Sequence, residues 1–548
     1  AVTITDPNFG TASTYTSSTV SLTNYSGATI SSNALTSLTL KNTGVKDDST
    51  DNGAVTLNNT VATTLDLSIS QSNNKGIGTI TNNTYTTLKT HLTGSDTSLT
   101  FNDTAATALT VDGTKKLSLT GTGLTNLATV TVSGSAGFSS STLAATVTDV
   151  NASGTSGSVS VTINPTTTTY EGGSGSDNVT IAVVPTKAIS GGAGTDTLTI
   201  ASTVITNPST VSFISGFESL ATATGAANAS IDVTGFTSLS NSQTGVTFSN
   251  VAAGIPLSVG GGSTTYTLKD ATGAADSLTV DVKGTAIVTS AGLESVTITA
   301  NDANNDLTLV DSAVTPTVTS ITISNTKDGK PLVLTATGNT KLVTVDASAM
   351  SGGLTYTTEG TLVETVTGGS GGDTLTAAGN ATTGKNDKLI GGGGNDTLIS
   401  NGGQVTLTGG TGNDTFVIAT PGTSLNSFTT ITDASVGDVI RLADKGALVA
   451  FAAVKLPLDS GTAVFQDFAN AAVNLGVKDA SVNGKISWFT FTNNKGETDT
   501  YIVESMHDAN VTAGFVDGVD LVVKLSGIVD LTNAAFVQNG SSPEIVIR

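Results

Sequence analysis

The sequence predicts an all-β protein, an elongated multi-domain β-solenoid or β-sandwich built from short strands. Three observations lead to this prediction. Short runs in which Thr, Ser or Val alternates with larger apolar residues recur along the 548 residues, for example SLTLKN at 37–42 and KLSLTG at 116–121. Gly, Asn and Ser separate these runs, as they commonly separate strands. Helical periodicity is nearly absent, with short candidates only at 82–92 and 463–475.

Residues 1–165 form the first predicted segment, a Thr/Val-rich domain of short strands. TLDLSIS at 64–70 and ATVTVSG at 128–134 place apolar residues at every second position, which favours strands with one buried face. The same phrases recur with turn residues every ten to twenty positions, so we expect a stacked scaffold.

A hexapeptide, Gly-Gly-x-Gly-x-Asp, occurs five times and marks two further segments, 166–200 and 366–420. Glycine permits the positive φ angles and close carbonyl approaches of a tight loop, and Asp supplies a hard anionic oxygen. Calcium prefers oxygen ligands of this kind. The copies are GGSGSD at 172–177, GGAGTD at 191–196, GGSGGD at 368–373, GGGGND at 391–396 and GGTGND at 409–414.

The spacing of these motifs predicts how they stack. Asp396 and Asp414 are 18 residues apart, and Asp177 and Asp196 are 19 apart. If nine residues form one loop and one short strand, two such units complete a coil, and loops 18 residues apart lie on the same edge. We therefore expect one calcium ion between each stacked pair of loops. The apolar residues expected to fill the interior, each two places after its Asp, are Val179, Leu198, Leu375, Leu398 and Phe416.

Two weaker copies extend the pattern. TTGKNDKLI at 382–390 places Asp387 nine residues before Asp396, and ATGAADSLT at 271–279 offers Asp276. Both aspartates are candidate calcium ligands.

The five hexapeptides resemble the nonapeptide repeats of RTX (repeats-in-toxin) proteins, which are calcium-binding parallel β-rolls exported by bacterial type I secretion. The resemblance implies RTX parallel β-roll segments in this chain, with loop carbonyls and Asp side chains as calcium ligands. Carried over to this sequence, the candidate ligands are Gly172, Ser174, Asp177, Gly191, Ala193, Asp196, Gly368, Ser370, Asp373, Gly391, Gly393, Asp396, Gly409, Thr411 and Asp414.

Residues 201–365 are predicted to be a repeated strand scaffold that contains the degenerate loop at Asp276. GFESL at 216–220, GLESV at 292–296 and LVTVDASAMSGGLTYT at 342–357 resemble the repeats of RTX-type surface-layer proteins. Those proteins form calcium-dependent two-dimensional lattices. The resemblance implies an extracellular location on the surface of a Gram-negative bacterium, self-association, and attachment to cell-surface polysaccharide through a region outside this sequence.

Residues 421–548 contain more aromatic residues and longer apolar runs, including the single Trp of the chain, Trp488. TTITDASVGDVIRL at 429–442 is similar to the cap that closes an RTX roll. KISWFTFTNNKGETDTYIVES at 485–505 predicts a hairpin, and 515–531 predicts further strands. The segment resembles the C-terminal region that RTX proteins present to the type I secretion machinery.

Composition restricts the partners of the chain. There are no cysteines, so disulfides and Cys-ligated metals are excluded. The 22 Lys and Arg against 43 Asp and Glu give a net charge of −21, which disfavours nucleic acid. No apolar run is long enough to span a membrane. The N-terminus lacks a basic region followed by an apolar stretch, so we expect a preceding leader or N-terminal region, or another export signal.

An enzyme is weighed against this structural interpretation. The two histidines, His91 and His507, do not begin an H-E-x-x-H motif, and the G-x-S-x-G around Ser370 lies inside a glycine loop. We therefore expect no enzymatic activity. The sequence leaves two alternatives to a lattice protein open: a secreted RTX adhesin that mediates attachment, and an exoenzyme with an RTX tail.

Overall fold

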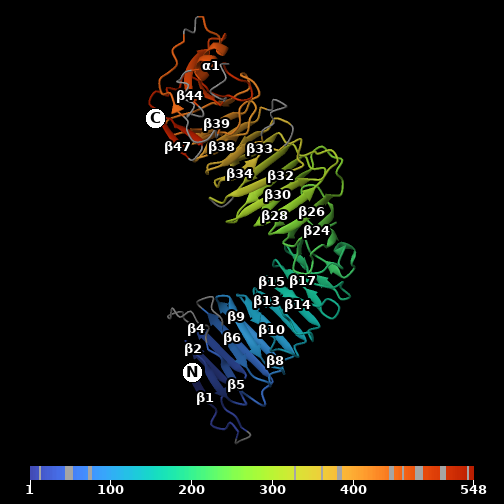
Figure 1. Ribbon diagram of the computed structural model, residues 1–548. Coiled ribbons are helices and arrows are strands. Elements are labelled where there is room, and N and C mark those ends of the chain that lie inside the picture. The colour runs from blue at the N-terminus through green and yellow to red at the C-terminus, as the bar shows by residue number, and fades with distance from the viewer. Residues whose placement is uncertain are drawn as a thin grey trace. The chain divides into compact units, whose positions relative to one another are not determined.

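The computed structural model describes most of the chain (Figure 1). It forms two compact units, Ala1–Val251 and Ala252–Arg548, which are described separately below. The described residues are 1–10, 14–42, 53–71, 77–325, 329–359, 362–378, 386–443, 450–458, 462–474, 485–506, 514–539 and 542–548.

Both units are parallel β-solenoids, in which the chain alternates between two sheets as it winds. Along the coils most strands pair with the strand two places later, as in the parallel pairs β17–β19 and β19–β21. Inward side chains then stack from coil to coil. Val179, Leu198 and Leu220 lie in register and are at most 1% exposed. The alternating sequence pattern therefore forms a narrow apolar core along the coils, and the predicted all-β solenoid is confirmed.

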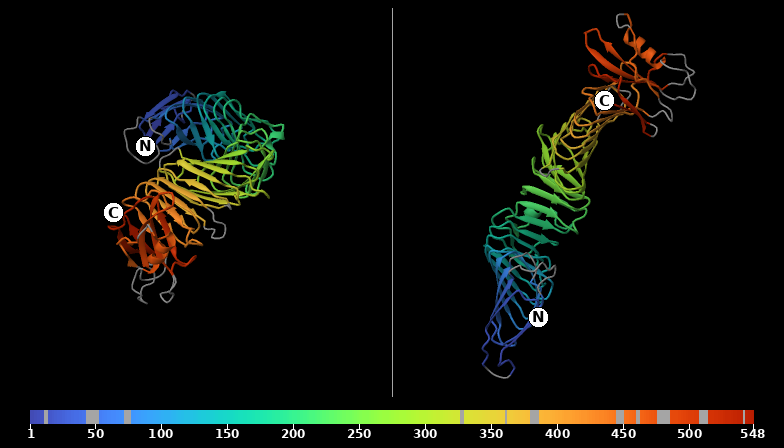
Figure 2. Two further views of the ribbon diagram at one scale, coloured as in Figure 1. Left: turned by 90° about the horizontal axis from the view of Figure 1, so that it is seen from above. Right: turned by 90° about the vertical axis from the view of Figure 1, so that its left-hand side faces the viewer.

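The first unit contains two long parallel sheets and one further parallel pair of strands (Figures 1 and 2). The odd-numbered strands are β1 (Val2–Thr5), β3 (Ala28–Ser31), β5 (Val55–Asn58), β7 (Thr79–Thr81), β9 (Thr97–Asn102), β11 (Leu117–Thr120), β13 (Phe138–Ser140), β15 (Val159–Thr162), β17 (Asn178–Ile181), β19 (Thr197–Ile200), β21 (Ser219–Thr222) and β23 (Ser238–Asn241). The even-numbered strands are β2 (Thr19–Thr23), β4 (Ser37–Asn42), β6 (Thr64–Gln71), β8 (Thr87–Gly94), β10 (Ala108–Gly113), β12 (Thr129–Gly134), β14 (Asp149–Thr155), β16 (Thr169–Glu171), β18 (Ile189–Ser190) and β20 (Ile214–Ser215), followed by the pair β22 (Ser230–Asp232) and β24 (Val246–Val251).

The second unit repeats this plan. Its odd-numbered strands are β25 (Leu257–Val259), β27 (Ser277–Val282), β29 (Ser295–Ala300), β31 (Ser320–Ser324), β33 (Thr344–Ala349), β35 (Thr365–Thr367), β37 (Lys388–Gly393), β39 (Thr406–Thr411) and β41 (Thr429–Ile431). The even-numbered strands are β26 (Gly262–Leu268), β28 (Thr285–Ser290), β30 (Asn305–Asp311), β32 (Leu332–Thr337), β34 (Leu354–Thr357), β36 (Thr374–Ala377), β38 (Thr397–Ser400), β40 (Thr415–Ile418) and β42 (Val439–Arg441).

A cap of a different kind follows the last coil. The segment 429–442, predicted to be the cap, instead adds β41 and β42 to the two sheets. The closing strands come from further along the chain: β46 (Leu521–Leu525) pairs in parallel with β41, and β48 (Ser542–Val546) pairs antiparallel with β42. The remaining elements of this region are β43 (Ala450–Phe451), α1 (Phe465–Asn474), β44 (Lys485–Thr492), β45 (Thr498–Ser505) and β47 (Ala535–Asn539).

The hairpin predicted at 485–505 is confirmed, because β44 and β45 pair antiparallel around the turn at 493–497. Helix α1 packs on this hairpin through Phe468 and Ala472, and Phe489 and Tyr501 complete the apolar cluster. The helix predicted at 463–475 is thus confirmed. The helix predicted at 82–92 is wrong: Leu88, Thr90 and Leu92 alternate inward on strand β8.

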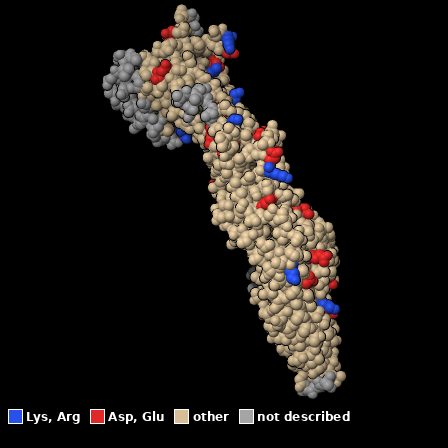
Figure 3. Space-filling model, turned by 90° about the vertical axis from the view of Figure 1, so that its right-hand side faces the viewer, with Lys and Arg blue, Asp and Glu red and all other residues tan. Residues whose placement is uncertain are grey.

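Charged side chains are sparse on the face shown in Figure 3. Part of the acidic charge lies inside the solenoids, since Asp177, Asp196, Asp373, Asp396 and Asp414 are each at most 2% exposed. Among the described residues, no helix has the length and apolar character needed to cross a membrane.

One buried acid of the first unit, Asp103, occupies a place where the preceding coil has an asparagine. Asn82 donates its side-chain amide to the carbonyl of Leu57 at 2.6 Å. Thr81 and Asn102 pair in register, so Asn82 and Asp103, which follow them, occupy equivalent places in adjacent coils. Asp103 is 2% exposed, and its Oδ2 atom has no hydrogen-bond partner. Burial raises the pKa of Asp103 to about 6. The charged carboxylate is therefore unfavourable in the folded protein.

We expect Asp103→Asn to stabilise the first unit at pH 7 by about 2–3 kcal/mol, because it removes a pKa shift of about two units, each worth about 1.4 kcal/mol. We expect its amide to donate to a carbonyl of the preceding coil, as the amide of Asn82 does. The folded-state pKa lies above the unfolded value, so the stability of the natural chain should decline as pH rises from about 4 to 7, and the variant should lose that slope. Chemical denaturation at pH 4, 5, 6 and 7 measures both effects. Asp66→Asn, at an exposed position on β6, is the control and should change neither. An unchanged pH slope in Asp103→Asn would contradict this account.

Candidate calcium sites in the stacked loops

The glycine-rich loops stack on one another in register. Asp373, Asp396 and Asp414 come directly before β36, β38 and β40, and these three strands pair in parallel with Thr374, Thr397 and Thr415 side by side. Asp177 and Asp196 precede the paired strands β17 and β19 in the same way. The predicted stacking of loops 18 and 19 residues apart is therefore confirmed. The predicted inward residues Val179, Leu198, Leu375, Leu398 and Phe416 are all fully buried.

The carboxylates of successive loops form a ladder of hydrogen bonds with the backbone. The N–H of Asp373 donates to Asp396 Oδ1 at 2.8 Å, and the N–H of Asp396 donates to Asp414 Oδ1 at 2.9 Å. The next step runs from Asp414 N–H to Asp438 Oδ1 at 2.9 Å. Asp177 N–H donates to Asp196 Oδ1 at 2.7 Å in the first unit. One oxygen of each ladder carboxylate is thereby fixed at a defined place between two coils.

The second carboxylate oxygen has no partner at three candidate positions. Oδ2 of Asp196, Asp276 and Asp396 is buried and accepts no hydrogen bond. A buried anionic oxygen without a partner costs several kcal/mol unless a proton or cation compensates it. At Asp177 and Asp373, by contrast, Oδ2 accepts the N–H of Gly173 at 3.2 Å and of Gly369 at 2.8 Å.

The electrostatics of the loops favour a bound positive charge. Burial, together with the charges of Asp373 and Asp414, raises the pKa of Asp396 to about 7, although the hydrogen bond from the Asp373 N–H acts in the opposite direction. Burial, together with the charges of Asp177 and Glu218, raises the pKa of Asp196 to about 6. These carboxylates are destabilised as anions in the absence of a cation, and a divalent ion would reverse this.

The loop glycines provide the space in which carbonyls and carboxylates approach. A Cβ atom on Gly391 would overlap the Asp396 carboxylate and the Gly409 carbonyl, and one on Gly368 would overlap Asp373 and the Gly391 carbonyl. Only glycine therefore brings carbonyls and carboxylates of adjacent coils this close together.

We expect Gly410→Ala to destabilise the second unit by at least about 3 kcal/mol, because Gly410 has a φ of +102° and its Cβ would overlap the Gly392 carbonyl. Gly254 is the matched control in the same unit, with a φ of +78° and open space around it. Gly254→Ala should cost about 1 kcal/mol from its φ alone. Denaturation in calcium measures both variants, and equal losses would show that close stacking of the loops contributes nothing.

A cation in these loops would be held mainly by carbonyls. Within the described ranges, no group of three or more His, Cys, Asp or Glu side chains is arranged to hold a metal ion. The available ligands are the unpartnered Asp oxygen and the backbone oxygens of the stacked loops, and calcium accepts such mixed oxygen sets. The residues present fit a calcium ion on chemical grounds.

The third loop positions lie at the rim of the loops. Ser174, Ala193, Ser370 and Thr411 are exposed, and Gly393 is partly buried. Ser174, Ala193, Ser370 and Thr411 are open to solvent and Gly393 has no side chain, so the backbone carbonyls are the candidate ligands at these positions. Gly172, Gly191, Gly368, Gly391 and Gly409 are buried next to the carboxylates.

Asp387 lies at a different edge from Asp396, because it precedes β37 of the odd-numbered sheet. Its Oδ1 accepts the N–H of Glu364 at 2.8 Å and its Oδ2 accepts the hydroxyl of Thr358 at 2.9 Å. The side chain thus holds three segments of neighbouring coils together. The loop 379–385 before it is outside the described residues.

Three acids of the ladders were missed in the sequence: Glu218, Glu294 and Asp438. Glu218 and Glu294 accept the N–H of Asp196 at 2.9 Å and of Asp276 at 2.7 Å. The phrases GFES and GLES could have identified the two glutamates, since each places a Glu directly before a strand, as the loops place an Asp. Asp438, in the last coil, follows a Gly and also directly precedes its strand, β42.

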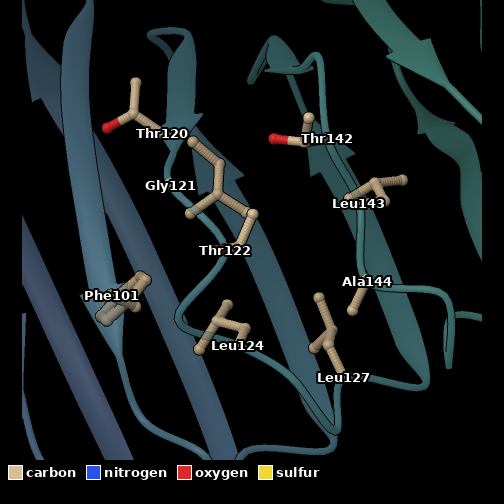
Figure 4. A pocket seen from close by; sticks show the side chains of 10 residues that line it. Phe101, Thr120, Gly121, Thr122, Leu124, Leu127, Thr142, Leu143 and Ala144 are labelled. Atoms are coloured by element: carbon tan, nitrogen blue, oxygen red, sulfur yellow. The ribbon is translucent and has the colours of Figure 1, made fainter.

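The remaining candidates for catalysis do not converge. His91 Nδ1 lies 2.6 Å from Asp112 Oδ1, and both side chains are about half exposed on the outer face of the first unit. Ser370 is exposed in its loop, and His507 is outside the described residues. A hollow of about 10 Å³ lined by Phe101, Leu124 and eight neighbours has room for about one water molecule (Figure 4).

A wider depression of about 340 Å³ lies on β32 and β34 of the second unit and is lined by residues 333–337 and 355–359. Its lining contains no His, Lys or Ser.

No model of a known protein family matches the chain. No curated protein matches it either.

Proposed function

We propose that the chain is the structural subunit of a bacterial surface layer, which assembles into a calcium-dependent two-dimensional lattice on the cell surface. The observation that carries the proposal is the stack of coils joined by buried carboxylates, with unpartnered oxygens at Asp196 and Asp396. A scaffold of this kind has a use for many cations and no need for a substrate pocket. The resemblance of the phrases at 216–220, 292–296 and 342–357 to surface-layer repeats supports the same function.

Calcium would couple folding to the extracellular environment. When calcium is scarce, burial and the charges of neighbouring loops disfavour the charged carboxylates, which is why the pKa of Asp396 is raised. Calcium that binds only the folded coils stabilises them by mass action. The chain would then remain unfolded during export by a type I machinery and would fold outside the cell.

Electron microscopy of the purified chain tests the proposal. With millimolar calcium we expect ordered sheets, and with excess chelator we expect them to disperse. Dispersed single molecules at saturating calcium, with intact β-sheet content, would contradict the lattice function. Binding of such molecules to glycans or cells would instead favour an adhesin.

A further inference from the structure

Two glutamates, Glu218 and Glu294, lie at the position that an aspartate takes in the glycine-rich loops. Glu218 Oε2 accepts the N–H of Asp196 at 2.9 Å, and Glu294 Oε2 accepts the N–H of Asp276 at 2.7 Å. The same bond joins Asp373 to Asp396 at 2.8 Å. Each Glu therefore extends a carboxylate ladder into a coil that has no Gly-Gly-x-Gly-x-Asp loop.

The backbone around the two glutamates is the same in both units. The N–H groups of Glu218 and Ser219 donate to the carbonyl of Asp196 at 3.1 and 2.9 Å. Those of Glu294 and Ser295 donate to the carbonyl of Asp276 at 2.9 and 3.3 Å.

The next coil is also alike in the two units. Thr237 donates its hydroxyl to the carbonyl of Glu218 at 3.1 Å, and Thr319 donates its hydroxyl to the carbonyl of Glu294 at 3.1 Å. Threonine thus follows glutamate in both ladders, and the run of carboxylates ends there. The arrangement Asp–Glu–Thr occurs twice, once in each of the two compact units.

Each pair contains an aspartate oxygen with nothing to compensate it. Asp196 is fully buried and Asp276 is 8% exposed, and Oδ2 of each is buried without a hydrogen-bond partner. Both oxygens face a glycine: a Cβ on Gly191 or on Gly273 would lie 2.9 Å from the Oδ2 atom. None of the ion pairs found among the described residues involves these acids.

We propose that Glu218 and Glu294 are ligands of two further calcium ions, one held between Asp196 and Glu218 and the other between Asp276 and Glu294. Two carboxylates balance the charge of one divalent ion. Both glutamates are only partly buried, so an ion can reach them from solvent. The phrase Gly-apolar-Glu-Ser then ends a run of cation sites, and Asp276 binds an ion without a glycine-rich block. This inference rests on the proposed calcium dependence of the fold.

The test is calcium titration of the full chain by calorimetry, for the natural sequence and for Glu218→Gln, Glu294→Gln and the double variant. Glutamine keeps an oxygen that can accept the Asp N–H, and it removes the charge. We expect each single variant to lose one ion from the stoichiometry, or to weaken one site about tenfold or more, and the double variant to lose two. Glu171→Gln, at an exposed position on β16, should bind as the natural chain does.

Unchanged stoichiometry and affinity in both single variants would overturn the proposal. Since a variant can lose its fold, Glu218→Asp and Glu294→Asp provide a second measurement. A ligand role predicts that Asp restores more of the binding than Gln does, and equal binding by the Asp and Gln variants would count against it. If Asp396 variants bound fewer calcium ions while the Glu218 and Glu294 variants bound as many as the natural chain, only the inference about the two glutamates would be overturned. Absence of sheets in the electron microscope would overturn the lattice function and leave this inference standing.

Discussion

Removal of divalent cations should open the glycine-rich coils and leave the N-terminal coils closed. In excess chelator, we expect amide exchange protection to fall about 100-fold or more in 166–200 and in the described part of 366–420, where the buried ladder carboxylates lose their counter-ions. A site saturated at about 100 times its Kd contributes about 2.7 kcal/mol, so the loss of even one ion per stack produces this effect. Hydrogen exchange read by mass spectrometry measures each segment separately.

The chain contains an internal control for this experiment. Strands β8, β10 and β12 stack through apolar residues such as Leu88, Leu109 and Val130, and no glycine-rich loop joins them. Their protection should stay within about threefold of its value in calcium. Two results would contradict the claim that cations stabilise the glycine-rich coils. One is unchanged amide protection of 391–414 in chelator, and the other is an equal loss of amide protection in β8, β10 and β12.

Asp396→Asn should change stability in opposite directions with and without calcium. Without calcium, the substitution removes a buried carboxylate whose pKa is raised to about 7. Relief of that shift is worth about 4 kcal/mol, and the unpartnered amide of Asn costs about 1–3 kcal/mol, so we expect a net gain of about 1–3 kcal/mol. With calcium, the same variant loses an anionic ligand and should be less stable than the natural chain by about 2 kcal/mol or more.

Denaturation of both proteins in calcium and in chelator at pH 7 provides the four values needed. Asp306→Asn, on β30 and partly exposed, should be within about 0.5 kcal/mol of the natural chain under both conditions. A loss of the same size with and without calcium would identify Asp396 as a hydrogen-bonding residue only, and would remove it from the calcium ligands.

The strands could be predicted because alternation of Thr with Val, Leu or Ile is a local property. Residues 64–70 and 128–134 carry it plainly, and they lie in β6 and β12. This alternation could not distinguish a solenoid from a sandwich, because strands in both folds bury one face. The structure settles it through register: Thr129 pairs in parallel with Asp149, the first residue of the strand two places later, in the next coil. The error at 82–92 has a similar cause, since Leu88 and Leu92 are four apart and also fit a helix.

The stacked loops could be predicted because their spacing is regular, whereas the ends of the ladders could not. Glu218 is 22 residues after Asp196, and Glu294 is 18 after Asp276. The spacing of 22 falls outside the regular 18 to 19, and neither Glu follows a Gly-Gly-x-Gly sequence, so only strand register aligns these glutamates with the loop aspartates. Asp387 was predicted from a spacing of nine, which places it at the opposite edge, where Glu364 and Thr358 bind both of its oxygens.

The central claim is that calcium ions join adjacent coils at the buried aspartates. Crystallography of the calcium-saturated chain, with anomalous scattering recorded to locate calcium, tests it most directly. The account predicts anomalous peaks within about 2.3–2.6 Å of Oδ2 of Asp196 and of Asp396, with the remaining ligands from loop carbonyls. Ordered density for these loops at saturating calcium, without a peak beside either oxygen, would contradict it.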